Sequence, residues 1–409
     1  MNDLALRAVS ALGLVAMIAI AWALSVERRR FPWRTVAWGL ALQLLLALVL
    51  LESATGQAFF VAANAVVDGI GRYTQVGTRF VFGPLAEGGF SIALGALPVI
   101  VFMGALFSVL FHLGVVQVVV RAFAAVFERT LGTSGAESVS AAASIFVGMV
   151  EAPLLVRPYV ERMTRSELFT VMTTGMATVA GSVLVVYAGM LGEGYAGHLL
   201  TASFLAAPGG VVLAKVMVPE TQTPLTGAGT RVELESPAAN AIDAASLGAI
   251  AGLRLAGYVA AMLVAFVALI ALANDGLGAI GGWLGIPGLS FQRLLGFGFA
   301  PFALLMGVAP GEALQVGGLL GVKTVLNEFL AYQELARLAA DGAISRRSTV
   351  LASYALCGFA NFGSLAILLG GLGGMAPARR ADIATMGLRS IATGTLATLM
   401  AACWAGIVV

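Results

Sequence analysis

The sequence predicts an all-α polytopic membrane protein in which two helical segments enter and leave the bilayer on the same side. Of the 409 residues, 59% are hydrophobic and only 11% are charged, whereas a soluble chain carries about 25% charged residues. Uncharged windows long enough to cross a bilayer recur along the chain. Two other apolar regions, one in each half, are interrupted at their centres. Such paired interruptions are typical of inverted-repeat transporters with a binding site near the midplane.

Several other classes of protein are excluded by composition. The net charge is only +2, and no basic run is interleaved with aromatic residues, so we expect no nucleic-acid partner. Two cysteines and two histidines are too few for a disulfide framework or a Cys/His metal site. No nucleophile with its base and no phosphate-binding loop is recognisable. The sequence therefore predicts neither an enzyme nor a bound cofactor.

The first two expected spans, 8–26 and 35–51, form a hairpin around a basic loop that contains Arg28, Arg29, Arg30 and Arg34. The positive-inside rule places this loop in the cytoplasm and the N-terminus outside. Basic residues, rather than a cleavage site of small residues, follow the first window, which indicates a retained span. Residues 55–86 mix apolar and polar residues and predict an interfacial amphipathic helix.

Six further crossings are expected from uncharged or nearly uncharged windows. They lie within 88–120, 168–192, 196–214, 255–274, 313–333 and 390–409. The window 255–274 lies between Arg254 and Asp275, and the window 313–333 is interrupted by Lys323, Asn327 and Glu328. Residues 219–236 predict a soluble loop, and the glycine-rich stretch 276–311, broken by prolines, is expected to include an interfacial helix.

These elements divide the chain into six expected units. They are an N-terminal hairpin with an interfacial helix (1–87), a scaffold helix (88–130), the first transport half with a re-entrant hairpin and the following helices (131–218), a soluble loop with an interfacial helix (219–247), a second scaffold helix with an interfacial helix (248–311), and the second transport half with a helix, a re-entrant hairpin and the last helix (312–409).

The two interrupted segments are residues 134–162 and 345–376. The first begins as a small-residue helix, breaks at Gly148 and Pro153, and then resumes. The second breaks at the polar stretch CGFANFGS. Each half is too short to cross a bilayer alone, so each segment is predicted to be a re-entrant hairpin. Exposed backbone at such a tip is tolerated only inside protein or against water.

Two carboxylates lie at membrane depth in this scheme. Glu151 is at the tip of the first interrupted segment; a carboxylate there is costly and indicates function, unless the tip is shallow and Glu151 only complements a helix N-terminus. Glu328 is the second, and its alternative role is a structural pair with Lys323. The spacing i, i+5 is poor for such a pair on one helix face.

The tip of the second interrupted segment carries Phe359, Asn361 and Ser364 among glycines. The amide and the hydroxyl can bind a polar solute, and glycine lets backbone approach it closely. Asn361 could also simply cap the following helix, and the two roles are compatible. Thr173, Thr174, Thr178 and Ser182 mark one span with hydroxyls, which in membrane helices usually bond their own backbone.

Four motifs in order make the chain resemble the concentrative nucleoside transporters, from about residue 90 to the C-terminus. The motifs are GMVEAPLLVRPY (148–159), SELFTVMTTGMATVAGS (166–182), VLNEFLAY (325–332) and CGFANFGSLAI (357–367). The resemblance implies a homotrimer whose protomers have eight spanning helices, two re-entrant hairpins and interfacial helices. It also implies a transport domain that moves against the trimeric scaffold, and the N-terminal hairpin is similar to the bacterial form.

The resemblance also implies a substrate site. The nucleobase would be held by Gly148, Met149, Val150 and Glu151, the ribose by Glu328, Asn361 and Ser364, with Phe359 as an apolar wall. Met149 and Val150 replace the family's usual Gln and Thr. Gly148 and Met149, together with Thr178 and Val179, are similar to the combination in purine-preferring members, and Met offers an adaptable apolar surface to a larger ring. We therefore hypothesise a preference for purine nucleosides.

The coupling cation is the second implied ligand. The family's sodium site corresponds to Ser144, Val147, Thr178 and Val179, where Ser144 replaces a frequent Asn and offers a shorter oxygen ligand. A proton carried by Glu151 or Glu328 is the alternative to Na⁺. The predicted function is cation-coupled nucleoside import across a bacterial inner membrane by an elevator-like movement, with lipid and nucleoside as partners. A transporter for another small polar solute and a passive channel are the alternative functions.

Overall fold

The computed structural model describes residues 3–87, 92–226 and 238–409. All of the regular structure in these ranges is helical, which confirms the all-α prediction. Residues 88–91, at the start of the expected third span, and 227–237, within the expected soluble loop, lie outside the described residues.

The N-terminal part consists of long helices joined by short turns. They are α1 (Asp3–Ala23), α2 (Trp33–Leu51), α3 (Ala54–Phe82), the short turns η1 (Gly83–Glu87) and η2 (Ile92–Ala96), α4 (Leu97–His112) and α5 (Val115–Leu131). The helix α3 lies at the position of the expected interfacial helix and begins where the Ser53 hydroxyl accepts a hydrogen bond from the Gly56 N–H.

The first interrupted segment consists of short helices, and the helices that follow it are largely buried. They are α6 (Gly135–Ala143), α7 (Glu151–Leu154), α8 (Arg157–Val160), α9 (Arg165–Ala177), α10 (Gly181–Leu191) and α11 (Tyr195–Met217). A capping box starts α6 at Ser134 and another starts α9 at Thr164, each with a glutamate three residues later. The expected span 168–192 is therefore two helices with a break after Ala177.

The second half of the chain repeats the alternation of long and broken helices. Its helices are α12 (Ala241–Leu284), α13 (Phe291–Leu305), η3 (Pro310–Glu312), α14 (Ala313–Val325), α15 (Glu328–Ala340), α16 (Arg346–Leu356), α17 (Phe362–Met375), η4 (Pro377–Arg379) and α18 (Arg380–Val408). The second interrupted segment consists of α16 and α17 with a non-helical break at 357–361, as its sequence predicted.

Seven stretches of helix among the described residues are long and apolar enough to cross a membrane. They are Asp3–Ala23, Trp33–Leu51, Ile92–His112, Arg165–Leu191, Tyr195–Met217, Ala241–Leu284 and Pro377–Val408. The eighth expected crossing, 313–333, is made of the shorter helices α14 and α15 and breaks at Leu326 and Asn327.

The helix α12 differs most from its prediction. A span at 255–274 was expected between Arg254 and Asp275, with a separate interfacial helix before it, but one helix of 44 residues runs through both charges. At 1.5 Å per residue it is about 66 Å long, roughly twice the hydrocarbon thickness of about 30 Å. A charged residue restricts which part of a helix can lie in lipid, but it does not end the helix. The ends of the helix are set by its caps. Here Asn240 caps the start and Gly285, with φ +68°, ends it.

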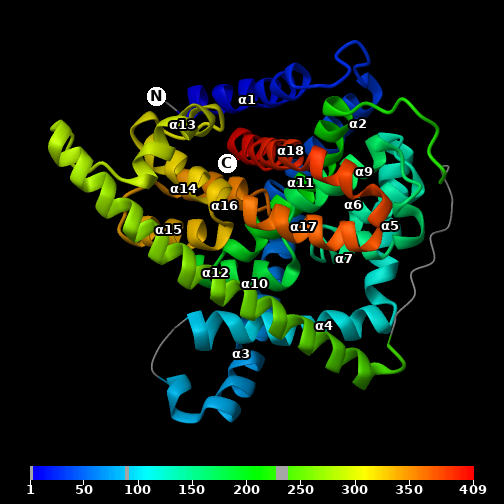
Figure 1. The fold of residues 1–409 in the computed structure, drawn as a ribbon, viewed down its shortest axis with the longest axis horizontal. Helices are drawn as coiled ribbons and strands as arrows, with labels where there is room; N and C mark the ends of the chain where they lie inside the picture. The colour runs from blue at the N-terminus through cyan, green and yellow to red at the C-terminus, as the bar shows by residue number, and fades with distance from the viewer. Residues whose placement is uncertain (1–2, 88–91, 227–237) are drawn as a thin grey trace.

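The helices divide into a buried centre and an exposed periphery. The apolar windows of α9–α10 and α11 are 89% buried and that of α18 is 83% buried, whereas that of α12 is only 11% buried. In Figure 1, α18 lies near the centre of the bundle, and α4 and α12 run beside each other along one side. Their backbones approach closely, because a Cβ on Gly104 would lie 2.5 Å from the Gly248 carbonyl oxygen.

Candidate functional site

Two half-helices start at polar residues in the middle of the bundle. The Asn327 side-chain oxygen accepts the Leu330 N–H (2.9 Å) and starts α15. The Asn361 side-chain oxygen accepts the Ser364 N–H (2.7 Å) and starts α17. Helix N-termini concentrate backbone donors and partial positive charge, so both ends suit polar or anionic atoms of a ligand.

Backbone hydrogen bonds bring three breaks of the chain together. The Gly181 N–H donates to the Phe146 carbonyl (2.9 Å), which joins the α9–α10 break to the first interrupted segment. The Phe359 N–H donates to the Thr178 carbonyl (3.3 Å), which joins the same break to the second interrupted segment. The α9–α10 break therefore contacts the tips of both segments.

The carboxylate of Glu328 is the polar centre of this region. Its Oε1 accepts the Tyr187 hydroxyl (2.9 Å), and its Oε2 accepts the Asn361 amide (2.8 Å). Glu328 is 7% exposed, Ser364 6% and Asn361 1%, so the group is almost closed off from the surroundings. Asn361 caps α17 as predicted and also donates to the Glu328 carboxylate, a contact that was not predicted; its role toward a solute stays a prediction.

Lys323 is not the partner of Glu328. Its ammonium is fully buried and donates to the Ala355 carbonyl (2.8 Å) and to the Thr398 hydroxyl (3.0 Å). The lysine therefore holds α14 against α16 and α18. The hydrogen bonds described for the Glu328 carboxylate come from neutral groups, and no described hydrogen bond or ion pair joins it to Lys323.

Glu151 makes none of the described hydrogen bonds of this group. Its residue is exposed, and its carboxylate folds back over the backbone of Gly148, where a Cβ would meet it. The sequence predicted that Glu151 and Glu328 would share one pocket. In this structure the first tip offers Glu151 to the surroundings instead, at the N-terminus of the short helix α7.

The other predicted base-contacting residues pack between the two interrupted segments. The backbone and Cβ of Met149 lie against Gly175 of α9, and Val150 lies against Gly371 of α17. Phe359 is half-buried beside the α9–α10 break. The tip of the first interrupted segment therefore contacts the later part of α17 through Val150, and Glu151 beside it is exposed.

The four predicted cation-site residues come from two breaks that touch. The hydroxyls of Ser144 and Thr178 donate to the carbonyls of Ser140 and Thr174, both at 2.9 Å. Such back-bonding was the expected behaviour of the threonines, and it leaves the hydroxyl lone pairs able to accept. Val147 is half-buried and Val179 is buried on the same two breaks, which the hydrogen bond between Gly181 and Phe146 joins.

Sequence reasoning missed Tyr187 as a residue of this centre. It is buried in α10, its hydroxyl donates to Glu328, and its ring stacks on Tyr332 with centroids 4.2 Å apart. The available signal was a single tyrosine within the uncharged window 168–192. A buried tyrosine usually finds a partner for its hydroxyl.

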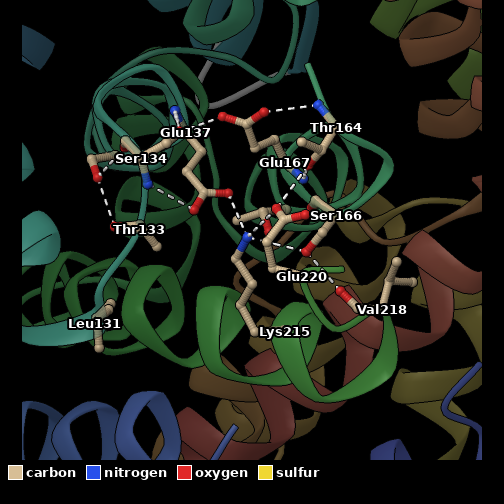
Figure 2. Close-up of polar contacts among 12 residues, drawn as sticks. Leu131, Thr133, Ser134, Glu137, Thr164, Ser166, Glu167, Lys215, Val218 and Glu220 are labelled. Atoms are coloured by element: carbon tan, nitrogen blue, oxygen red, sulfur yellow. Dashed lines mark hydrogen bonds and ion pairs between the residues drawn. The ribbon is translucent and has the colours of Figure 1, made fainter. Parts of the chain in front are cut away.

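A second polar cluster that the sequence did not predict lies at the base of the first interrupted segment (Figure 2). We call it the basal cluster, and it comprises Ser134, Glu137, Thr164, Ser166, Glu167, Lys215 and Glu220. The Lys215 ammonium lies 2.8 Å from a Glu137 oxygen and 3.7 Å from a Glu220 oxygen, and it donates to the Ser166 hydroxyl (3.1 Å).

The two capping boxes of α6 and α9 are cross-linked within the basal cluster. The Ser134 hydroxyl donates to Glu167, and the Thr164 hydroxyl donates to Glu220 (2.8 Å). Glu137 and Glu167 are each 1% exposed. A cavity of about 270 Å³ beside the cluster is also lined by Arg30 of the basic loop. The cluster thus ties the starts of α6 and α9 to the end of α11.

Apolar helices long enough to cross a membrane enclose broken helices, and half-helix N-termini and a buried carboxylate lie at the breaks. These features are typical of a membrane transporter of a polar solute. Family models agree and cover most of the chain. They match the Na⁺ dependent nucleoside transporter N-terminus at residues 12–85, nucleoside recognition at 93–194, and the Na⁺ dependent nucleoside transporter C-terminus at 198–406. The chain belongs to the Na⁺ dependent nucleoside transporter family.

Relatives and solved structures are similar over nearly the whole chain. An uncharacterized transporter of Haemophilus influenzae is 46% identical, with 97% of each chain covered. The sodium/nucleoside cotransporter 1 of Mus musculus is 41% identical over 98% of this chain and 63% of its own length. The structure of CNTnw in an inward-facing substrate-bound state is 43% identical, with 98% of both chains covered and a TM-score of 0.91.

Proposed function

We propose that this protein is a cation-coupled symporter that imports nucleosides across the bacterial inner membrane. Membership of the family and the similarity to the mouse sodium/nucleoside cotransporter 1 support the nucleoside and the sodium ion as the transported pair. The arginine-rich loop between α1 and α2 supports a cytoplasmic position for that loop.

The observation that carries the substrate assignment is the Glu328–Asn361 pair. A carboxylate and an amide, held at the starts of two half-helices, present acceptors and a donor to a polyhydroxyl compound. Ser364 adds a hydroxyl on the same turn of α17. A site of this kind binds ribose hydroxyls and rejects analogues that lack them, because its buried polar groups would then stay unpaired.

The nucleobase would lie against the tip of the first interrupted segment. We assign it to the segment Gly148–Met149–Val150, with Glu151 turning inward when the solute binds and Phe359 forming an apolar wall. Met149 and Val150 cannot provide the side-chain hydrogen bonds of Gln and Thr, and the larger apolar surface suits a purine. Competition of labelled uridine uptake by adenosine, inosine and thymidine tests this preference; equal potency would contradict it.

We propose Na⁺ as the coupling ion, held by oxygens at Ser144, Val147, Thr178 and Val179. Hydroxyl and carbonyl oxygens are suitable ligands for a hard cation, and the two breaks that carry these residues are joined by a hydrogen bond. A cation that draws the two breaks together would pre-form the solute site, and such coupling is reciprocal. Uptake that persists when choline replaces Na⁺, yet disappears with a protonophore, would assign the coupling to a proton on Glu151 or Glu328.

The proposed architecture has eight crossings, two re-entrant hairpins and interfacial helices, assembled as a homotrimer. The broken pair α14–α15 supplies the eighth crossing, and each half of the interrupted segments is too short to span the bilayer. The low burial of α12 supports a peripheral scaffold role for α4 and α12, against which the buried centre would move in an elevator-like manner.

Substitution of the two central residues tests the function directly. We expect Glu328→Gln and Asn361→Ala each to lower nucleoside affinity at normal membrane expression, measured by labelled nucleoside uptake and by nucleoside-induced thermal stabilisation with and without sodium. Normal uptake in both variants would refute the site. A passive channel predicts uptake that neither saturates nor accumulates, and a transporter of another solute predicts no stabilisation by any nucleoside.

A further inference from the structure

Two stacked tyrosines lie behind the Glu328 carboxylate. The rings of Tyr187 in α10 and Tyr332 in α15 are nearly parallel, with centroids 4.2 Å apart and an interplanar angle of 20°. The Tyr187 hydroxyl donates to Glu328 (2.9 Å), whereas the Tyr332 hydroxyl donates to the Ser353 carbonyl (2.6 Å). The stack therefore connects α10 and α15 to α16, the first helix of the second interrupted segment.

Tyr187 is placed to act on the carboxylate rather than on a solute. It is 1% exposed and Tyr332 is 0% exposed, whereas Glu328 retains 7%. The ring of Phe329 also packs on Tyr187, with centroids 6.1 Å apart. The described partner of this hydroxyl is the Glu328 carboxylate, so Tyr187 acts on a solute through that carboxylate.

The two donors on Glu328 fix how its carboxylate is oriented. Tyr187 holds Oε1 and Asn361 holds Oε2, so rotation of the carboxylate plane would break one hydrogen bond or the other. Each oxygen still has acceptor capacity, because a carboxylate offers about four lone-pair sites. A carboxylate held in one plane can accept hydrogen bonds from two neighbouring hydroxyls at once, whereas a rotating one accepts a single hydroxyl well.

We propose that Tyr187 is a positioning residue that orients Glu328 to recognise a pair of adjacent sugar hydroxyls, and that it thereby sets the preference for ribonucleosides over deoxynucleosides. This inference rests on the proposed nucleoside function. It adds Tyr187 of α10, which is not among the predicted ligand contacts. It also assigns to this residue the recognition of one feature of the solute, the pair of adjacent sugar hydroxyls.

The stack offers a matched pair of variants for the test. Tyr187→Phe and Tyr332→Phe each remove one buried hydroxyl and keep the ring, but only the first removes a donor to Glu328. We expect Tyr187→Phe to raise the KM for adenosine about tenfold, the scale of one hydrogen bond to a charged group, with the maximal rate changed less than twofold. The KM for 2′-deoxyadenosine should rise much less, so the preference for the ribonucleoside falls. Tyr332→Phe should keep the wild-type preference.

Nucleoside-induced shifts in melting temperature are measured beside uptake, so that a variant made in small amounts still reports its relative affinities. In a Glu328→Gln background, Tyr187→Phe should leave the ratio of adenosine to 2′-deoxyadenosine affinity unchanged, because the residue acts through the carboxylate. The inference is overturned if Tyr187→Phe and Tyr332→Phe change this ratio equally, or not at all. If the wild-type protein gives neither uptake nor stabilisation with any nucleoside, the proposed function fails instead.

Discussion

Single residues in the centre of this protein satisfy two demands at once. Asn361 caps α17 through its oxygen and binds Glu328 through its nitrogen. Because the side-chain oxygen and nitrogen of this amide are both hydrogen-bonded, a substitution that introduces charge disturbs the contact with Glu328. A residue that only caps a helix would tolerate the same substitution. Asn and Asp cap helices about equally well, so a change from one to the other separates the two roles.

We therefore expect Asn361→Asp to preserve α17 but to place a second carboxylate against Glu328. Two like charges at hydrogen-bond distance cannot both ionise easily, and an ionised carboxylate at position 361 offers Glu328 no donor. Nucleoside affinity, measured by thermal stabilisation, should fall at least tenfold, which corresponds to about 1.4 kcal/mol. Asn240→Asp is the matched control, because Asn240 caps α12 at an exposed position. Equal behaviour of the two variants would contradict the double role of Asn361.

At the scale of elements, the break of the second interrupted segment depends on close backbone contact. A Cβ on Gly358 would lie 2.8 Å from the Ala177 carbonyl oxygen and 2.7 Å from a Thr398 methyl carbon. No heavy atom lies within 4 Å of the corresponding position on Gly370, in the middle of α17. The two glycines therefore serve different purposes in one segment.

Gly358→Ala should displace the tip from the α9–α10 break and abolish most nucleoside uptake, since backbone atoms cannot move aside as a flexible side chain can. Gly370→Ala should leave uptake normal and stabilise α17 by about 0.5–1 kcal/mol, because alanine loses less entropy in a helix. Uptake assays and melting temperatures in detergent measure both effects. Normal transport by Gly358→Ala would mean that the contact between the two breaks is dispensable.

The basal cluster joins elements through charge rather than close packing. Lys215 is the cation nearest to Glu137, and both side chains are buried. We expect Lys215→Met to cost about 3–5 kcal/mol, because it leaves a buried carboxylate without its ammonium partner. The melting temperature should fall and should recover in part when Glu137→Gln is added. Arg337→Met, which removes ion pairs at the surface, is the control and should change little. A decrease that Glu137→Gln does not relieve would argue against the charge pairing.

At the scale of the whole molecule, the helices sort by burial into a centre and a periphery. Exposed apolar residues such as Val264 and Leu269 lie along α12, and Val76 and Phe80 lie along α3. Faces of this kind must meet lipid or other copies of the chain. The close glycine contacts between α4 and α12 make these two helices one unit within that periphery.

If the protein is the proposed homotrimer, its mass in mild detergent should correspond to three chains of 41.8 kDa each after correction for bound detergent. Light scattering coupled to size exclusion measures this mass, and native mass spectrometry provides an independent check. A mass of one chain across a wide range of protein concentration would rule out a stable trimer, although each protomer could still transport.

Much of the fold could be predicted because its signals are local. Hydropathy located the spans. The Ser/Thr-to-Glu spacing of the capping boxes that start α6 and α9 is an equally local signal, although it was not among the predictions. The polar break at 357–361 and the interrupted span at Asn327 were visible as residues unsuited to lipid. The length of α12 was missed because a charge ends a hydrophobic window without ending a helix.

The sequence by itself determined that the chain crosses a membrane, and it located the breaks of the two interrupted segments and the polar residues near them. The break after Ala177 was not predicted. Only the tertiary structure decided which of these residues meet. Tyr187 and Glu328 are 141 residues apart, and Lys215 and Ser166 are 49 apart. The structure also pairs Glu328 with Asn361 through a hydrogen bond and leaves Glu151 exposed. Hydropathy and caps act within a few residues, whereas a buried carboxylate takes its partners from whichever helices packing brings beside it.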